Sequence, residues 1–277
     1  MICKLLREFG APANRSPRRL YARNVDLLAV ALLTFVSATQ LRAQLIVDPL
    51  EVELSTARPV AIVTVRNESG SAQQATLDIA DWDRAESGEN RFFPAATQKG
   101  SCGDLIKAFP LALRVEPHDI QVVRIALTAA APAAECWSVV FIAQAAPQAS
   151  SSQFGISYAF RTGVKVYALA AQSSHDGEID SVMMREDSTA PNKQSLVVGF
   201  HNIGSSHESA HGSVEIRRAD NSVAAKLAIA GFPSLPGAHR SIVLALPRLP
   251  PGRYIALAML DFGGQEVTAG ELEFESH

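Results

Sequence analysis

The stretch VAIVTVRNESGSAQQATLDIADW, residues 60–82, contains two short runs in which apolar and polar residues alternate. The first run ends in the polar sequence NESGS, and the second run ends at Trp82. Alternation with a period of two is typical of half-buried β-strands, and Asn, Ser and Gly are typical of the turns between them. This stretch therefore predicts two strands joined by a turn.

The same pattern recurs along most of the chain. Short runs rich in Val, Ile and aromatic residues return about every eight to twelve residues, and no window of similar length has an amphipathic helical period. The clearest further runs are LIVDPLEVEL (45–54), QVVRIALT (121–128), CWSVVFIA (136–143), QSLVVGFHN (194–202), RSIVLALP (240–247) and RYIALAMLDF (253–262). The sequence therefore predicts an all-β protein with two tandem immunoglobulin-like antiparallel β-sandwiches, residues 44–170 and 179–277, joined by a linker at 171–178.

The first 43 residues differ in composition from the rest. They contain seven Lys or Arg residues and two acidic residues, and a short apolar run from Leu27 to Val36 leads to Leu41 and Ala43. A basic segment, an apolar run and a cleavage site with small residues are typical of a secretory signal, so we expect export and cleavage after Ala43. The apolar run is shorter than the roughly 20 residues that span a membrane, and an uncleaved anchor stays the alternative.

The charge balance after residue 43 is acidic. This part of the chain carries 18 Lys or Arg residues and 26 Asp or Glu residues, a net charge of −8. Such a surface gives no electrostatic reason to bind the phosphate backbone of a nucleic acid. We therefore expect no nucleic-acid partner.

Three cysteines are present, at positions 3, 102 and 136. Removing the signal segment removes Cys3 and leaves an even pair, as expected in an oxidising compartment. A bridge between Cys102 and Cys136 would contribute roughly 3 kcal/mol by restricting the unfolded chain. Two buried free thiols are the alternative, because the sequence does not place the two side chains.

The segment SSHESAHGS, residues 205–213, contains the H-E-x-x-H pattern of zinc metalloproteases at His207, Glu208 and His211. That chemistry needs both histidines on one face of a helix, with a third ligand elsewhere. Here the pattern lies between two predicted strands, and the positions of the usual third ligand hold other residues. We interpret it as a solvated loop with two surface histidines, and predict no metal site. A metal-dependent hydrolase built on these residues is a remote alternative.

No other catalytic pattern is visible. The chain has no G-x-S-x-G, S-x-x-K or C-x-x-C sequence and no phosphate-binding glycine loop. Asp81 and Asp83 flank Trp82, but neighbouring positions of a strand point to opposite faces, so we interpret the segment as a strand that ends in a buried Trp. We therefore expect no enzyme activity, no cofactor and no small-molecule substrate.

The first block resembles the amino-terminal domain of the periplasmic pilus-assembly chaperones, the PapD-like family. The resemblance lies in an ordered set of segments over residues 44–170. These are LIVDPLEVEL, VTVRN before a turn, LDIADW, FFP, LALRVEPHDIQVVRI, CWSVVFIAQAAP and FGISYAFRTGVKVYA. The second block diverges from the family and resembles a generic immunoglobulin or fibronectin-like module.

The resemblance implies a periplasmic chaperone that lends an edge strand to protein subunits of a pilus or other surface structure, with an outer-membrane usher as a further partner. The lent segment would be QFGISYAFR, in which the large side chains alternate with small ones. These side chains are Phe154, Ile156, Tyr158 and Phe160. The alternative is that the same alternation packs against the domain's own core.

The resemblance also assigns Lys165 as the residue that holds the carboxylate of the subunit's chain terminus. The family pairs this lysine with an arginine on the first strand, whereas the corresponding neighbourhood here contains Glu51 and Glu53 and no arginine. Nearby carboxylates oppose the binding of another carboxylate. An exported adhesion or scaffolding module without chaperone activity is therefore the alternative function.

Overall fold

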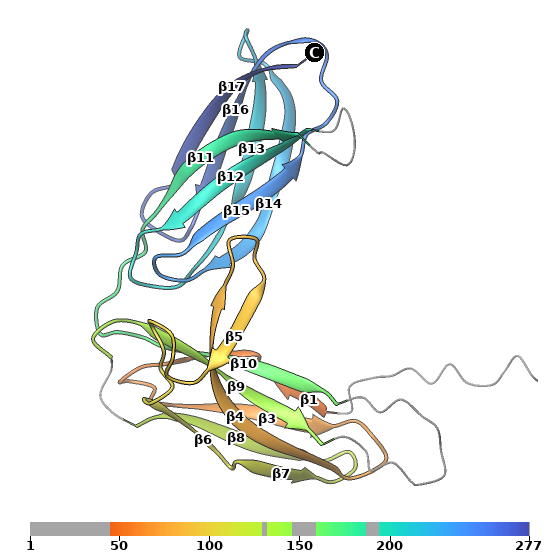
Figure 1. Cartoon of the computed structure of the whole chain (residues 1–277), viewed down its shortest axis with the longest axis vertical. Helices are drawn as coiled ribbons and strands as arrows, with labels where there is room; N and C mark the ends of the chain where they lie inside the picture. Colours follow the sequence, from red (N-terminus) through yellow and green to blue (C-terminus); the bar gives the residue numbers. More distant parts are fainter. Residues whose placement is uncertain (1–44, 129–131, 146–158, 187–193, 277) are drawn as a thin grey trace, which may run out of the picture. The chain divides into compact units, whose positions relative to one another are not determined.

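A computed structural model describes residues 45–128, 132–145, 159–186 and 194–276 (Figure 1). These residues belong to one compact unit, Ala43–His277. The described residues contain 17 strands and no helix, which confirms the predicted all-β fold class. Within the described ranges, no helix is long and apolar enough to cross a membrane.

The first sandwich is built from β1 to β10. Their bounds are β1 (Leu45–Asp48), β2 (Glu51–Leu54), β3 (Val60–Asn67), β4 (Gln73–Arg84), β5 (Asn90–Pro94), β6 (Ile106–Phe109), β7 (Ala112–Val115), β8 (Ile120–Leu127), β9 (Cys136–Gln144) and β10 (Arg161–Ala168). One sheet has the order β1-β3-β8-β6, and the other has the order β2-β10-β9-β4-β5, with β7 also paired to β4. The segments predicted from alternation between residues 60 and 82 are β3 and most of β4.

The predicted first strand is divided between the two sheets. β1 pairs antiparallel with β3, so that Leu45 lies opposite Asn67, whereas β2 pairs parallel with β10. Pro49 lies between the two strands, where its ring removes a backbone donor and breaks the ladder. At Pro49 the chain therefore crosses from the sheet that contains β1 to the sheet that contains β2.

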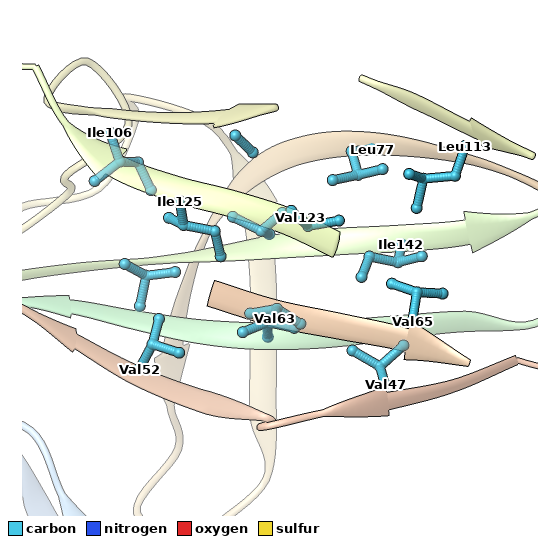
Figure 2. Close-up of a cluster of buried hydrophobic side chains, with 14 of the residues drawn as sticks. Val47, Val52, Val63, Val65, Leu77, Ile106, Leu113, Val123, Ile125 and Ile142 are labelled. Atoms are coloured by element: carbon cyan, nitrogen blue, oxygen red, sulfur yellow. The ribbon is translucent and has the colours of Figure 1, made fainter. Parts of the chain in front are cut away.

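The core of the first sandwich lies between its two sheets (Figure 2). Val63 and Val123 project from one sheet, and Ile142 and Leu77 project from the other. Each strand contributes every second residue, because successive side chains of a strand point to opposite faces. Burying a side chain of this size stabilises the fold by roughly 1.5–3 kcal/mol.

The second sandwich is built from β11 to β17. Their bounds are β11 (Gly177–Glu186), β12 (Gln194–Asn202), β13 (Glu208–Arg218), β14 (Val223–Ser234), β15 (His239–Ala245), β16 (Gly252–Asp261) and β17 (Thr268–Ser276). The sheets have the orders β11-β12-β15 and β14-β13-β16-β17. Phe200 and Leu196 of the first sheet pack with Val214, Ile216 and Leu260 of the second. The predicted pair of tandem sandwiches is therefore confirmed.

Candidate functional site

The candidate site centres on the first half of β10. Strand β9 pairs with β10 along its whole length, from Arg161 to Ala168, whereas β2 pairs with β10 from Lys165 onward. Among the described residues, the other edge of Arg161–Val164 has no strand partner. An unpaired edge exposes backbone N–H and C=O groups that can bind a strand of another chain. The fold therefore presents a short open edge at this position.

Phe160 is the predicted donor residue that lies within the described part of the chain. Its side chain is half-buried, and its carbonyl oxygen accepts a hydrogen bond from the backbone N–H of Gln144 at 2.9 Å. This bond extends the pairing of β9 with β10 by one residue toward the N-terminus. Phe160 and Val164 are an even number of positions apart on the strand, so their side chains point to the same face, and Val164 points into the core. The remaining predicted donor residues, Phe154, Ile156 and Tyr158, lie outside the described residues.

Lys165 lies where β2 joins the edge of β10. Its side chain is 17% exposed, and Nζ lies 2.7 Å from Oε1 of Glu51, the residue directly opposite it on β2. Nζ also lies 4.8 Å from the ring centroid of Trp82. The lysine predicted to hold a carboxylate is therefore already paired with a carboxylate of its own chain. No arginine takes part in this pair.

An aromatic cluster supports this end of β10. Trp82 is 1% exposed and packs edge-on against Tyr167, with ring centroids 6.0 Å apart. Burial raises the pKa of the Tyr167 hydroxyl, and the Glu51 charge adds to this effect, so the ring stays neutral. The His207 ring stacks on the Tyr167 ring, and the two ring centroids are 3.9 Å apart. These contacts hold the backbone of β10 beside Lys165 in a fixed position.

The H-E-x-x-H segment does not form the predicted solvated loop. Glu208 and His211 lie on β13, which begins at Glu208, and the alternation of the strand buries Glu208 and exposes His211. His207 is half-buried and its Nδ1 lies 2.7 Å from Oε1 of Glu135. Glu208 accepts a hydrogen bond from the backbone N–H of Asp176 at 2.8 Å. The three side chains therefore have separate surroundings, and within the described ranges no group of three His, Cys, Asp or Glu residues is placed to hold a metal ion.

His207 and Glu208 give the protein a pH-dependent stability. Burial opposes the charge on His207, but the hydrogen bond to Glu135 and the carboxylates around it outweigh burial and raise its pKa. Burial raises the pKa of Glu208 to about 7. The His207 contribution is complete below its unfolded pKa and is lost as the pH rises through its raised pKa. The Glu208 contribution is complete below about pH 4.5 and is lost as the pH rises through about 7.

We therefore expect the protein to be more stable at pH 6 than at pH 8. Glu208 alone contributes roughly 1.4 kcal/mol to this difference in the free energy of unfolding. Urea unfolding at the two pH values measures it, and Glu208→Gln should remove that share of the difference. Equal pH dependence of the variant and the unaltered protein would contradict the assignment to Glu208.

The disulfide between Cys102 and Cys136 is present, as predicted, with the two Cα atoms 5.2 Å apart. It lies beside Asp81, whose burial the sequence did not predict. The Asp81 carboxylate is buried and accepts hydrogen bonds from the backbone N–H groups of Thr97 and Gln98, at 2.8 and 2.9 Å. The hydroxyl of Ser101 donates a further bond to it. Asp81 thus holds the loop that carries Cys102 against the end of β4.

Solved structures that match this chain include three chaperones. The fimbrial chaperone CfaA is 11% identical, with a TM-score of 0.48, and the match covers 84% of this chain and 99% of CfaA. The CupB2 chaperone of Pseudomonas aeruginosa is 16% identical, with a TM-score of 0.43 and coverages of 84% and 100%. The DraB chaperone of E. coli is 14% identical, with a TM-score of 0.41 and coverages of 84% and 97%.

These identities are low, and both of the first two matches cover 84% of this chain. The resemblance in the sequence, in contrast, was confined to the first block. No protein-family model matches the chain, and no curated protein matches it by sequence.

Proposed function

We propose that this protein is a periplasmic chaperone that binds β-rich subunits of a pilus or another surface structure by lending them a strand. The open edge of β10 at Arg161–Val164 carries this proposal. The alternating segment QFGISYAFR leads directly into this edge. The signal-like first 43 residues are consistent with export, and the chaperones similar in fold assist the assembly of fimbriae.

Strand addition supplies both affinity and selectivity. Main-chain hydrogen bonds to an open edge bind any extended segment, and pockets for alternate side chains select among such segments. A subunit that lacks one strand of its own sandwich exposes a groove between its sheets. Four large apolar side chains at alternate positions can fill such a groove from one strand, because they share one face. These are the side chains of Phe154, Ile156, Tyr158 and Phe160.

Lys165 would bind the terminal carboxylate of the subunit. A buried or half-buried charge forms stronger ion pairs than an exposed one, and Lys165 is mostly shielded by its surroundings. The Glu51 carboxylate lies 2.7 Å from Nζ and would have to move aside or share the ammonium group. The incoming carboxylate would therefore bind in competition with Glu51.

The competition gives opposite effects for two substitutions. Lys165→Met should weaken subunit binding roughly 10- to 100-fold, because it removes one charge-assisted hydrogen bond. Glu51→Gln should strengthen binding by up to about five-fold, because an exposed carboxylate partner is worth at most about 1 kcal/mol. Dissociation constants for the co-purified subunit, measured by biolayer interferometry, would test both.

Lys107→Met is the matched control, because Lys107 is an exposed lysine of β6. It should leave the affinity unchanged. Weaker binding by Glu51→Gln would show that Glu51 supports the subunit and does not compete with it. An unchanged affinity of Lys165→Met would remove Lys165 from the site.

Co-purification tests the proposed function directly. The chain, tagged at its C-terminus, is expressed in its native host, recovered from the periplasm, and its companions are identified by mass spectrometry. A small β-rich subunit at one copy per chain is expected. Recovery of the protein without a companion would contradict the proposal and favour an exported adhesion or scaffolding module.

A further inference from the structure

The tip of the β4–β5 hairpin contacts strand β15. The backbone N–H of Ser241 donates a hydrogen bond to the carbonyl oxygen of Glu86 at 2.9 Å. Gly88 lies in the same tip and has a φ of 102°, in the left-handed region that favours glycine. A Cβ atom at Gly88 would lie 2.7 Å from Nη2 of Arg240. The glycine thus lets a guanidinium group of β15 come close to the backbone of the hairpin.

Two arginines meet at this glycine. Nη1 of Arg84, on β4, donates a hydrogen bond to the carbonyl oxygen of Gly88 at 2.8 Å, and Nη2 of Arg240 lies on the side where a side chain of Gly88 would project. Arg240 is 7% exposed, and Arg84 is half-buried. Burial lowers the pKa of Arg240, and the charge of Arg84 lowers it further. Two positive charges therefore lie near each other and are largely shielded from water.

The charge of this arginine pair is not neutralised by the described part of the chain. Within the described ranges, neither Arg84 nor Arg240 forms an ion pair, and the carboxylate of Asp83 is engaged by Arg91 at 2.7 Å. Buried charges in proteins are as a rule paired with an opposite charge, because an unpaired one loses its hydration without compensation. The pair of arginines therefore lacks an anion.

Aromatic rings offset only part of the two charges. Cζ of Arg84 lies 5.7 Å from the ring centroid of Trp82, and Cζ of Arg240 lies 5.5 Å from the ring centroid of Phe232. The face of a ring attracts a cation through its quadrupole, which is a weaker partner than a full negative charge with hydrogen-bond acceptors. The rings thus make the site tolerable for two cations but do not replace an anion.

Each guanidinium group also has N–H donors without a partner. The Nε atoms of both arginines are buried and form no hydrogen bond with the described residues. Nη1 of Arg84 is bonded to Gly88, and Nη1 of Arg240 donates to the carbonyl oxygen of Pro233 at 3.0 Å. The two Nη2 atoms have no hydrogen-bond partner among the described residues and, unlike the Nε atoms, are not sealed from solvent. One terminal nitrogen of each arginine is therefore available to a small ligand.

We propose that Arg84 and Arg240 bind one small dianionic oxyanion of the sulfate or phosphate class. Guanidinium groups suit such oxygens, because their N–H donors form charge-assisted hydrogen bonds with them. One dianion neutralises both arginines, whereas a monoanionic carboxylate neutralises only one. The ion joins the β4–β5 hairpin to β15 and stabilises this contact in proportion to its affinity. The site does not include the open edge of β10, so it does not depend on the proposed function.

Isothermal calorimetry of the mature chain with sodium sulfate tests the proposal, in a chloride buffer at constant ionic strength. One sulfate ion per chain is expected, with a dissociation constant of about 1 mM or lower, and sodium acetate should bind at least about ten-fold more weakly. Arg84→Met and Arg240→Met should each weaken sulfate binding at least about ten-fold, because each removes a charge-assisted hydrogen bond. Arg253→Met is the matched control, since Arg253 is an exposed arginine of β16, and it should bind sulfate as the unaltered protein does.

Thermal unfolding supplies a second readout. In chloride alone, Arg240→Met should be at least as stable as the unaltered protein, because an apolar side chain replaces an unpaired buried charge. Sulfate stabilises proteins in general by exclusion from their surface, so the variant measures this background. Sulfate should raise the melting temperature of the unaltered protein by more than that of Arg240→Met.

Three results would overturn the proposal. The first is no sulfate binding by the unaltered protein in calorimetry. The second is equal sulfate affinity of the unaltered protein, Arg84→Met and Arg240→Met, which would mean an adventitious ion only. The third is acetate binding as tight as sulfate binding, which would replace the dianion by a carboxylate. Circular dichroism would verify that each variant is folded.

Discussion

Replacing Ile156 with aspartate is expected to abolish subunit capture. In the proposed complex this side chain fills an apolar groove of the subunit, and a carboxylate buried there without a partner costs several kcal/mol. A loss of more than about 100-fold in affinity follows, since each 1.4 kcal/mol is a factor of ten. The yield of subunit that co-purifies with the variant from the periplasm measures the effect.

Ser157→Asp is the matched control for this substitution. It places the same charge at the neighbouring position, whose side chain points to the other face of an extended strand. We expect this variant to recover the subunit at the normal yield. If Ile156→Asp recovers as much subunit as the unaltered chain, the segment does not lend its side chains to the partner. If both variants recover equally little subunit, the introduced negative charge causes the loss, and the side chains on one face of the segment do not decide binding.

Removing the disulfide is expected to destabilise the first sandwich by about 3–4 kcal/mol. Cys102 and Cys136 are 34 residues apart, and the bridge restricts the unfolded chain by closing a loop of this length. The double variant Cys102→Ser/Cys136→Ser should unfold on the order of 10 °C below the unaltered protein. Differential scanning calorimetry measures the shift.

The second sandwich contains neither cysteine of the bridge and serves as an internal control. A melting transition that belongs to this sandwich should keep its temperature in the double variant. Adding a reducing agent to the unaltered protein should reproduce the shift of the first transition. An unchanged first transition in both experiments would show that Asp81 and the core hold the loop without help from the bridge.

The strands could be predicted because their burial follows the alternation in the sequence. Val63 and Val65 are buried while their neighbours Ile62 and Thr64 are not, as a period of two requires. The division between β1 and β2 could not be predicted, since Pro49 marks a break but does not tell which sheet each half joins. Pairing with β3 or with β10 is decided by residues far away in the chain.

The same reasoning failed where polar residues are buried. Glu208 begins β13, although the sequence before it suggested that the loop continued, and its burial depends on the backbone N–H of Asp176. Asp81 faces away from Trp82 and is still buried, because a loop folds over that face and donates hydrogen bonds to it. Alternation identifies which residues share a face, but it does not tell what covers that face.

The donor residues of the candidate site were derived from the alternation of large and small side chains and from the family resemblance. Their role stays a prediction. The structure adds the open edge of β10 beside Phe160 and the partner of Lys165. The Glu51 contact follows from the parallel register of β2 with β10, which the sequence of either strand alone does not contain.

The pair of Glu51 and Lys165 has a consequence for the lifetime of a complex. Glu51 is attached to the same fold as Lys165, so its local concentration at the ammonium group is very high and does not fall on dilution. In the proposed complex, whenever the carboxylate of the subunit moves away from the lysine, Glu51 can take its place before the subunit carboxylate returns. A carrier that must hand over its cargo benefits from such a built-in substitute, because release then requires no outside competitor.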